Sequence, residues 1–169
     1  MRGASVTYIP IGMIHSCHTE AKATPIQPVY AAGCAGRAEI FPEYSEGLSD
    51  LEDFSHIYLL YHFHKAGPPR LKVKPFLDDV ERGVFAARTP FRPNPLGLSI
   101  VRLLRREGNL LFLDGVDILD GTPLLDVKPY TARFDRIDTL SNGWQDALSE
   151  KVVAERSQRE YRKTDAGQL

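Results

Sequence analysis

Short runs of apolar residues, separated by turn-forming residues, dominate the first 130 positions of the chain. Residues 55–65, SHIYLLYHFHK, are β-branched and aromatic without polar alternation, which predicts a central strand covered on both faces. The stretch GLSIVRLL, the turn REGN and the stretch LLFLDGVDIL predict a β-hairpin over residues 97–119. A turn at LDGTP then leads into a further strand, LLDVKPY.

Weaker patterns complete the chain. Residues 7–14 and 37–41 read as strands, residues 44–55 as a short helix or turn, and LKVKPF and GVFAARTP as shorter strands. Trp144, Leu148 and Val152 recur at a spacing of four, which predicts one helix with a single apolar stripe over residues 143–161. The sequence therefore predicts a mainly β fold, a small antiparallel β-barrel with short helices and a C-terminal helix. The barrel domain would span residues 1–141, and residues 142–169 would form a helix and tail packed on it.

The composition fits a single globular domain outside membranes. The chain has 169 residues, of which 43% are hydrophobic and 25% charged. No apolar run approaches the roughly 20 residues that cross a bilayer, and the first residues lack the apolar core of a signal peptide. We therefore expect a cytoplasmic protein. Cys17 and Cys34 are too far apart for a C-x-x-C pair, and we expect plain thiols rather than a disulfide.

Histidines fall in two clusters, one with His15 and His18 and the other with His56, His62 and His64. His62 and His64 share a strand face, and together with Cys17 or His18 they would have the chemistry of a zinc site. No ligand spacing supports that reading, so we expect buried, hydrogen-bonded histidines and no metal.

Positive charge is concentrated in the middle of a chain whose net charge is −1. Residues 65–106 hold ten basic and three acidic side chains. Such a segment is either a solvated face or a contact surface for phosphates, with Lys72, Lys74, Arg105 and Arg106 as candidates.

Three prolines stiffen the stretch TPFRPNPLGLS around Arg92. Pro90, Pro93 and Pro95 restrict the residues before them to extended geometry, so this loop loses little entropy when it binds a ligand. Arg88 and Arg92 would present two guanidinium groups suited to carboxylates or phosphates. The alternative is a rigid loop held to the body by structural salt bridges.

A second dense stretch, LDGTPLLDVKPY, follows the predicted hairpin. Asp120-Gly121 is a strong turn signal, and Asp126, Lys128 and Tyr130 share one face of the strand that follows. That face is either solvated or part of a site. The glycine within residues 114–116 predicts a bulge at which the backbone approaches another group closely.

The chain contains no G-x-G-x-x-G, no P-loop and no G-x-S-x-G. The blocks GVFAARTPFRPNPLGLS and GVDILDGTPLLDVKPY closely resemble the signature blocks of the TsaA-like family, also called YaeB or TrmO. The resemblance extends to IGMIHS, PIQP and LEDFSHIYLLYHFHK, and covers about residues 8–137.

This resemblance implies an S-adenosylmethionine-dependent methyltransferase with a small β-barrel. It implies methylation at N6 of N6-threonylcarbamoyladenosine beside the tRNA anticodon, by a homodimer whose site lies near the subunit interface. The cofactor contacts that it implies are Pro25, Gln27, Pro28, His64, Lys65, Arg88, Leu98, Asp114, Gly115, Val116 and Asp117. The chain has Ile26 where the family often has a basic residue, and where bacterial members carry an added C-terminal domain we expect only a helix and a tail.

Methyl transfer to such a nitrogen requires loss of a proton, so a nearby base or polarising group is expected. We assign this role to Asp120, with Lys128 and Tyr130 as further candidates, and expect Arg92 to hold the threonyl carboxylate or the carbamoyl oxygen. The alternative for Asp120 is a purely structural place in its turn. Two other functions stay open: a regulatory module that binds S-adenosylmethionine, and a methyltransferase for a different acceptor.

Overall fold

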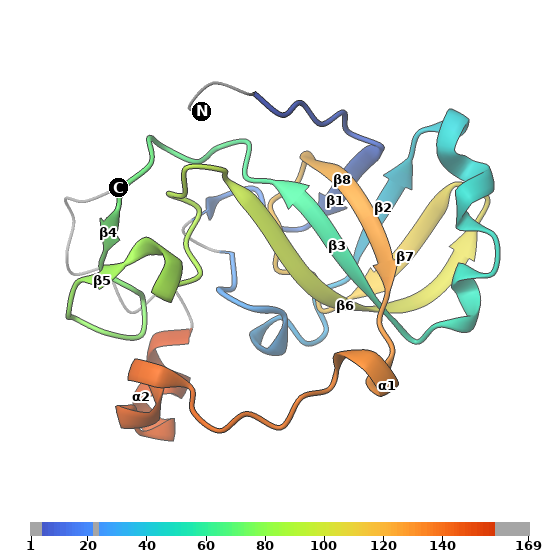
Figure 1. The fold of residues 1–169 in the computed structure, drawn as a ribbon. Coiled ribbons are helices and arrows are strands. Elements are labelled where there is room, and N and C mark those ends of the chain that lie inside the picture. Colours follow the sequence, from blue (N-terminus) through green and yellow to red (C-terminus); the bar gives the residue numbers. More distant parts are fainter. Residues whose placement is uncertain (1–4, 22–23, 158–169) are drawn as a thin grey trace.

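Six antiparallel strands close into a barrel in a computed structural model that describes residues 5–21 and 24–157 (Figure 1). Around the barrel the strands follow the order β1-β2-β7-β6-β3-β8, and β8 pairs with β1 to close it. The predicted fold class is confirmed. The strands are β1 (Gly12–Ser16), β2 (Gly36–Ile40), β3 (His56–His62), β6 (Leu96–Glu107), β7 (Leu110–Asp114) and β8 (Thr122–Pro129).

The barrel interior is filled by alternate residues of each strand. In β3, Ile57 and Leu59 are fully buried and Tyr61 is nearly so, while the intervening residues are half-buried or exposed. The prediction that this strand is covered on both faces was therefore wrong. A sheet that closes on itself has one face inside and one outside, and the apolar residues on the outer face of β3 remain partly accessible.

The predicted β6–β7 hairpin is confirmed, and β6 is by far its longer arm. A register shift between Leu103 and Arg105 introduces an irregularity that turns the long strand around the barrel. Leu96, Leu98 and Ile100 lie on the outer face of β6 and are 44%, 61% and 39% exposed. One end of the barrel thus presents an apolar outer surface.

Outside the barrel, a two-stranded sheet and short helices complete the described chain. GVFAARTP was expected to be a strand, but only its first glycine is in one, and a 3-10 turn follows because Ala87 N–H donates to the Val84 carbonyl. The helix or turn expected over residues 44–55 forms two 3-10 helices. These elements are η2 (Pro28–Tyr30), η3 (Pro42–Leu48), η4 (Leu51–Asp53), β4 (Lys72–Val73), β5 (Arg82–Gly83), η5 (Val84–Ala86) and α1 (Ala132–Asp135).

The single helix expected over residues 143–161 is interrupted. A 3-10 helix, η6 (Gly143–Ala147), ends at the extended residue Leu148, and the α-helix α2 (Glu150–Ser157) starts after it. The Ser149 hydroxyl accepts the Val152 backbone N–H, which caps the new helix. The prediction for residues 158–161 lies outside the described residues.

Two connections meet at one end of the barrel, and they carry the predicted cofactor residues Pro25, Gln27, Pro28 and Arg88. The 17–35 loop joins β1 to β2, and the 84–95 loop joins β5 to β6. The Trp144 indole N–H donates to the Ala86 carbonyl at 2.8 Å, so η6 contacts the 84–95 loop. None of the helices in the described part of the chain has the length and apolar character needed to cross a bilayer.

Candidate functional site

A cavity of about 1030 Å³ lies between the two loops and the first half of β6. Its walls come from residues 24–29 of the 17–35 loop, residues 85–90 and Arg92 of the 84–95 loop, and residues 96–100 of β6. Residues 63–66, which follow β3, and residues 117–119 also line it, together with Ala21, Tyr58, Tyr61, Thr122 and Gln145. The volume is at the upper end of the range for small-molecule sites.

The two loops touch through a pair that the sequence analysis had placed in the cofactor site. The Arg88 guanidinium donates a hydrogen bond to the Gln27 side-chain carbonyl at 2.6 Å. Gln27 in turn donates its amide N–H to the Ile26 carbonyl, which orients the side chain. Pro25 and Pro28 line the same cavity, so this part of the predicted set is brought together.

A buried chain of hydrogen bonds ends in a carboxylate at the cavity. The Tyr61 hydroxyl lies 3.0 Å from the Ser99 hydroxyl, and Ser99 donates to Asp117 Oδ1 at 2.7 Å. Tyr61 and Ser99 are 4% and 2% exposed. A Cβ at position 97 would overlap the Tyr61 ring, so Gly97 gives the ring its place. Asp117 was predicted, whereas Tyr61 and Ser99 were missed, although the glycine within the predicted strand signalled a close approach.

His64 and Lys65 follow β3 and line the cavity beside Leu98 of β6. Burial lowers the pKa of His64, and the nearby charges of Lys65 and His62 lower it further. The imidazole is therefore neutral at neutral pH. Its Nδ1 lies 3.4 Å from the Thr122 hydroxyl, which itself donates to the Leu119 carbonyl. The Thr122 oxygen can therefore accept from Nδ1–H, a tautomer that leaves Nε2 with a lone pair.

Arg92 also lines the cavity, but its contacts are within its own loop. One guanidinium nitrogen donates to the carbonyls of Val84 and Ala87, at 2.9 and 2.7 Å. The group lies 5.5 Å from the centre of the Phe85 ring. The alternative of an arginine that holds a rigid loop is therefore realised, through backbone carbonyls rather than through salt bridges.

Asp114, Gly115 and Val116 adjoin the cavity without lining it among the described residues. Asp114 Oδ1 accepts the backbone N–H groups of Gly33 and Gly115, which ties β7 to the 17–35 loop. Gly115 has a φ of +77°, and a side chain there would approach the Pro28 carbonyl. The expected bulge is instead the left-handed residue after the strand, and these residues support the loop that carries Gln27.

The other proposed catalytic residues lie elsewhere. Among the described residues, the cavity lining does not include Asp120, Lys128 or Tyr130. Asp120 accepts the Ser16 backbone N–H at 3.1 Å, and its own N–H donates to the His18 carbonyl, so it holds the corner between β1 and β8. Lys128 forms an ion pair with Asp126 at 2.8 Å on the exposed face of β8.

Tyr130 is not among the described residues that line the cavity, but it lies beside one of them. Its ring lies 5.7 Å from the ring of Tyr58, which does line the cavity, and 6.4 Å from that of His56. The assignment of catalysis to Asp120, Lys128 or Tyr130 stays a prediction, and their contacts in this chain are structural.

The basic segment does not form one surface. Arg105 pairs with Glu107 at 2.6 Å and lies 3.6 Å over the Phe112 ring, and Arg106 contacts Glu52 at 3.3 Å. These arginines lie near the β6–β7 turn, at the opposite end of the molecule from β4 with Lys72 (Figure 1). β6 has 12 residues, and a strand extends about 3.3 Å per residue. The length of this strand therefore keeps the two groups apart.

Comparison with known families identifies the barrel. The model of the tRNA-methyltransferase O N-terminal domain family matches residues 13–136. A probable S-adenosyl-L-methionine-binding protein of Pyrococcus abyssi is 53% identical over 139 residues, which are 82% of this chain and 76% of that protein. A human tRNA (adenine(37)-N6)-methyltransferase is 41% identical over 133 residues, 75% of this chain but only 30% of that protein.

Solved structures agree with the fold. A crystal structure of TrmO from Pseudomonas aeruginosa has a TM-score of 0.70 and 40% identity, with 83% of this chain and 63% of that chain covered. A further TrmO crystal structure has a TM-score of 0.72 and 43% identity, with 83% of this chain covered. This chain spans a little under two thirds of the length of these solved chains.

Proposed function

The chain belongs to the tRNA-methyltransferase O N-terminal domain family, and from that premise we propose that it is an S-adenosylmethionine-dependent tRNA methyltransferase. We propose N6 of N6-threonylcarbamoyladenosine, beside the anticodon, as the acceptor. The observation that carries the proposal is the meeting of Pro25, Gln27, Pro28, Arg88 and Leu98 around one cavity.

The cavity has donors and acceptors that match S-adenosylmethionine. Arg88 and Lys65 would bind the methionyl carboxylate, because guanidinium and ammonium groups pair well with carboxylates. Asp117 would accept hydrogen bonds from the ammonium group or from the ribose hydroxyls, since its carboxylate is held in place by Ser99. Leu98, with the prolines of the 17–35 loop, offers an apolar wall for the adenosyl group.

S-adenosylmethionine supplies a methyl group on a sulfonium and would leave as S-adenosylhomocysteine. The protein's part is to align the acceptor nitrogen with that methyl and to take up the proton that N6 loses. Within the cavity, neutral His64 has the protonation state required of the proton acceptor. The Arg92 guanidinium, already held by two carbonyls, would orient the threonyl carboxylate or the carbamoyl oxygen.

We also propose that the chain works as a homodimer in the cytoplasm. The support is the apolar outer face of β6, where Leu96, Leu98 and Ile100 lie next to the cavity mouth. A second copy seated on this face would cover apolar surface and border the cavity. Light scattering of the purified protein tests this state, and a monomer at micromolar concentration would contradict it.

Turnover separates the enzyme from a regulatory module. The enzyme releases S-adenosylhomocysteine only when tRNA is present, whereas a binding module retains S-adenosylmethionine unchanged. Mass spectrometry of nucleosides from cells with and without the gene identifies the acceptor. We expect the methylated threonylcarbamoyl nucleoside to disappear with the gene. Loss of another methylated nucleoside instead would show a different acceptor.

A further inference from the structure

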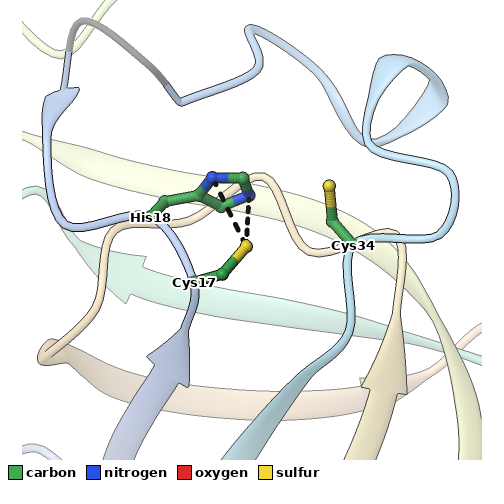
Figure 2. A group of neighbouring side chains, drawn as sticks. All are labelled: Cys17, His18 and Cys34. Carbon is green, nitrogen blue, oxygen red and sulfur yellow. Dashed lines mark hydrogen bonds between the residues drawn. The ribbon is translucent and has the colours of Figure 1, made fainter.

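Two cysteines and a histidine gather where the 17–35 loop leaves and rejoins the barrel. Cys17 and His18 follow the last residue of β1, and Cys34 lies two residues before β2. Figure 2 shows the three side chains grouped between the two strands. The two thiol sulfurs and one nitrogen of the histidine ring all lie within 4.8 Å of one another. This is a different set from the grouping with His62 or His64 considered from the sequence.

The hydrogen bond of His18 fixes which ring nitrogen is available. His18 is only 8% exposed, and its Nε2 lies 2.9 Å from the Val116 carbonyl oxygen. A carbonyl can only accept, so Nε2 carries the proton and Nδ1 keeps its lone pair. Metal-bound histidines usually donate their other ring N–H to a carbonyl or carboxylate in this way, which orients the ring. Nδ1 lies 3.8 Å from the Cys17 sulfur.

The two thiols are close enough to affect each other. Their sulfurs lie within 4.8 Å of each other. Two thiolates at that distance repel each other when no cation lies between them. A divalent cation between them reverses that balance, because it stabilises both thiolates.

We propose that Cys17, Cys34 and Nδ1 of His18 form a Zn²⁺ site at the neck of the 17–35 loop. Two thiolates and one imidazole are a zinc ligand set, and tetrahedral zinc needs ligand atoms about 3.5–3.8 Å apart. The Cys17–His18 separation already matches this, and the exposed Cys17 side chain can turn to meet the ion. Water takes the fourth position. Binding displaces one proton from each thiol, so two protons pass to the buffer.

The ion would act on the loop rather than on the chemistry. It joins the two ends of the segment that carries Gln27, next to the paired residues Ser16 and Gly36. Closing a loop at its neck reduces the freedom of the unfolded chain, as other cross-links do. The site does not depend on the proposed methyl transfer.

Cobalt is a direct probe of this ligand set. The full chain is purified with its thiols reduced, freed of metal with a chelator, and titrated with Co²⁺ in the absence of oxygen. We expect one equivalent to produce a thiolate-to-cobalt charge-transfer band and the intense visible bands of tetrahedral cobalt. One equivalent of Zn²⁺ should remove both, because zinc binds such sites more tightly than cobalt.

Variants locate the ion. Cys17→Ser and Cys34→Ser should each weaken Zn²⁺ binding at least about 100-fold, measured by competition with a coloured chelator, since each removes a thiolate ligand. Zn²⁺ should also protect both thiols of the wild type from alkylation. His56→Gln is the matched control, because this exposed histidine lies outside the cluster, and its zinc affinity should equal that of the wild type.

Three results would overturn the proposal. The first is a reduced wild type that shows no charge-transfer band. The second is a band that survives in both serine variants, which would place the ion elsewhere. The third is a protein whose cysteines form a Cys17–Cys34 disulfide in air and which binds no zinc after reduction. Cys17 is exposed, so its serine variant should fold and keep the test decisive.

Discussion

The two loops that meet across the cavity are held in different ways. The 84–95 loop contains three prolines, and Arg92 bonds two carbonyls of the same loop. The 17–35 loop contains two prolines. Its described residues bond to the end of β7 and the segment after it, where Asp114 accepts the Gly33 N–H and the Val116 carbonyl accepts from His18. One loop is rigid by its own sequence, and the other is rigid through what it touches.

This difference separates two parts of ligand binding. A loop that is already rigid loses little entropy when a ligand arrives, so it fixes where the charged groups lie. A loop held from outside can respond to its neighbours, and its position depends on the Gln27–Arg88 contact and on the Cys17–His18–Cys34 cluster. The following predictions test this contrast, from the largest expected effect to the smallest.

Replacing Arg92, which braces the 84–95 loop, should have the largest effect. Arg92→Met keeps the apolar stem but leaves the Val84 and Ala87 carbonyls without their charged donor, and should lower the free energy of unfolding by about 2–3 kcal/mol. Urea denaturation measures this. Arg92→Lys keeps the charge but loses the planar fork, so it should weaken tRNA binding more than donor binding, and equal losses would limit Arg92 to bracing the loop.

Arg70 provides the control for that experiment. Its guanidinium lies 4.8 Å over the Phe91 ring on the exposed side of the same loop, so Arg70→Met should cost well under about 1 kcal/mol. A loss in Arg92→Met no larger than in Arg70→Met would show that the prolines alone hold the loop.

Replacing basic residues tests whether tRNA binds at the cavity on the side of the 84–95 loop. Lys72 and Lys74 lie in a segment that bonds to this loop through the Leu71 carbonyl and the Val84 N–H. Replacing both lysines by glutamine should reduce the salt dependence of tRNA binding by about two units of slope, one for each phosphate contact. Filter binding at several salt concentrations measures the slope.

Arg105 and Arg106 form the matched pair at the far end of β6. Because both already contact carboxylates, their replacement by glutamine should leave the salt slope unchanged. Equal effects of the two double variants would mean that the RNA surface extends over both ends of the barrel.

The contact between the loops should show measurable coupling. In a double-mutant cycle with Gln27→Ala and Arg88→Ala, we expect a coupling free energy of about 1 kcal/mol for S-adenosylmethionine binding by calorimetry. The value is moderate because Arg88 is exposed and water competes for it. Additive single effects would show that each loop binds the ligand independently.

The smallest effect concerns pH. The pKa of His64 is lower in the folded protein than its ordinary value of 6.5, so the unfolded chain binds the proton more readily. Stability from this group is complete above pH 6.5 and is lost as the pH falls towards the folded pKa. Urea denaturation at about pH 7.5 and about pH 5.5 should show a smaller loss for His64→Gln than for the wild type. The same loss in both would exclude His64 as the source.

The barrel and half of the site could be predicted from the sequence. Strand lengths, the Gly-Asn turn and the signature blocks were enough to predict the fold and the cavity residues from Pro25 to Leu98. The partners of individual side chains could not be predicted, because a sequence does not say whether Arg92 turns to a ligand or to the carbonyls of its own loop. Asp120 shows the same limit, since Asp-Gly predicts a turn but not the strand that the turn faces.

The prediction of one helix over residues 143–161 was wrong for a different reason. The spacing of Trp144, Leu148 and Val152 fits one helix, yet the Trp144 indole bonds the Ala86 carbonyl and Ser149 starts a new helix. Tertiary contact and a local cap together outweighed the periodic pattern. A serine followed directly by an acidic residue, as in Ser149-Glu150, is a helix-start signal that could have placed the break.

Closure of the barrel also sets an order of events during synthesis. Gly12 in the first strand pairs with Leu124 in the last, and Leu59 at the centre of the fold pairs with Val127. Neither β1 nor β3 can complete its pairing until β8 has left the ribosome. The nascent chain must therefore keep apolar strands with open edges for most of its translation, so we expect this small domain to fold slowly and to be prone to aggregation while it is being made.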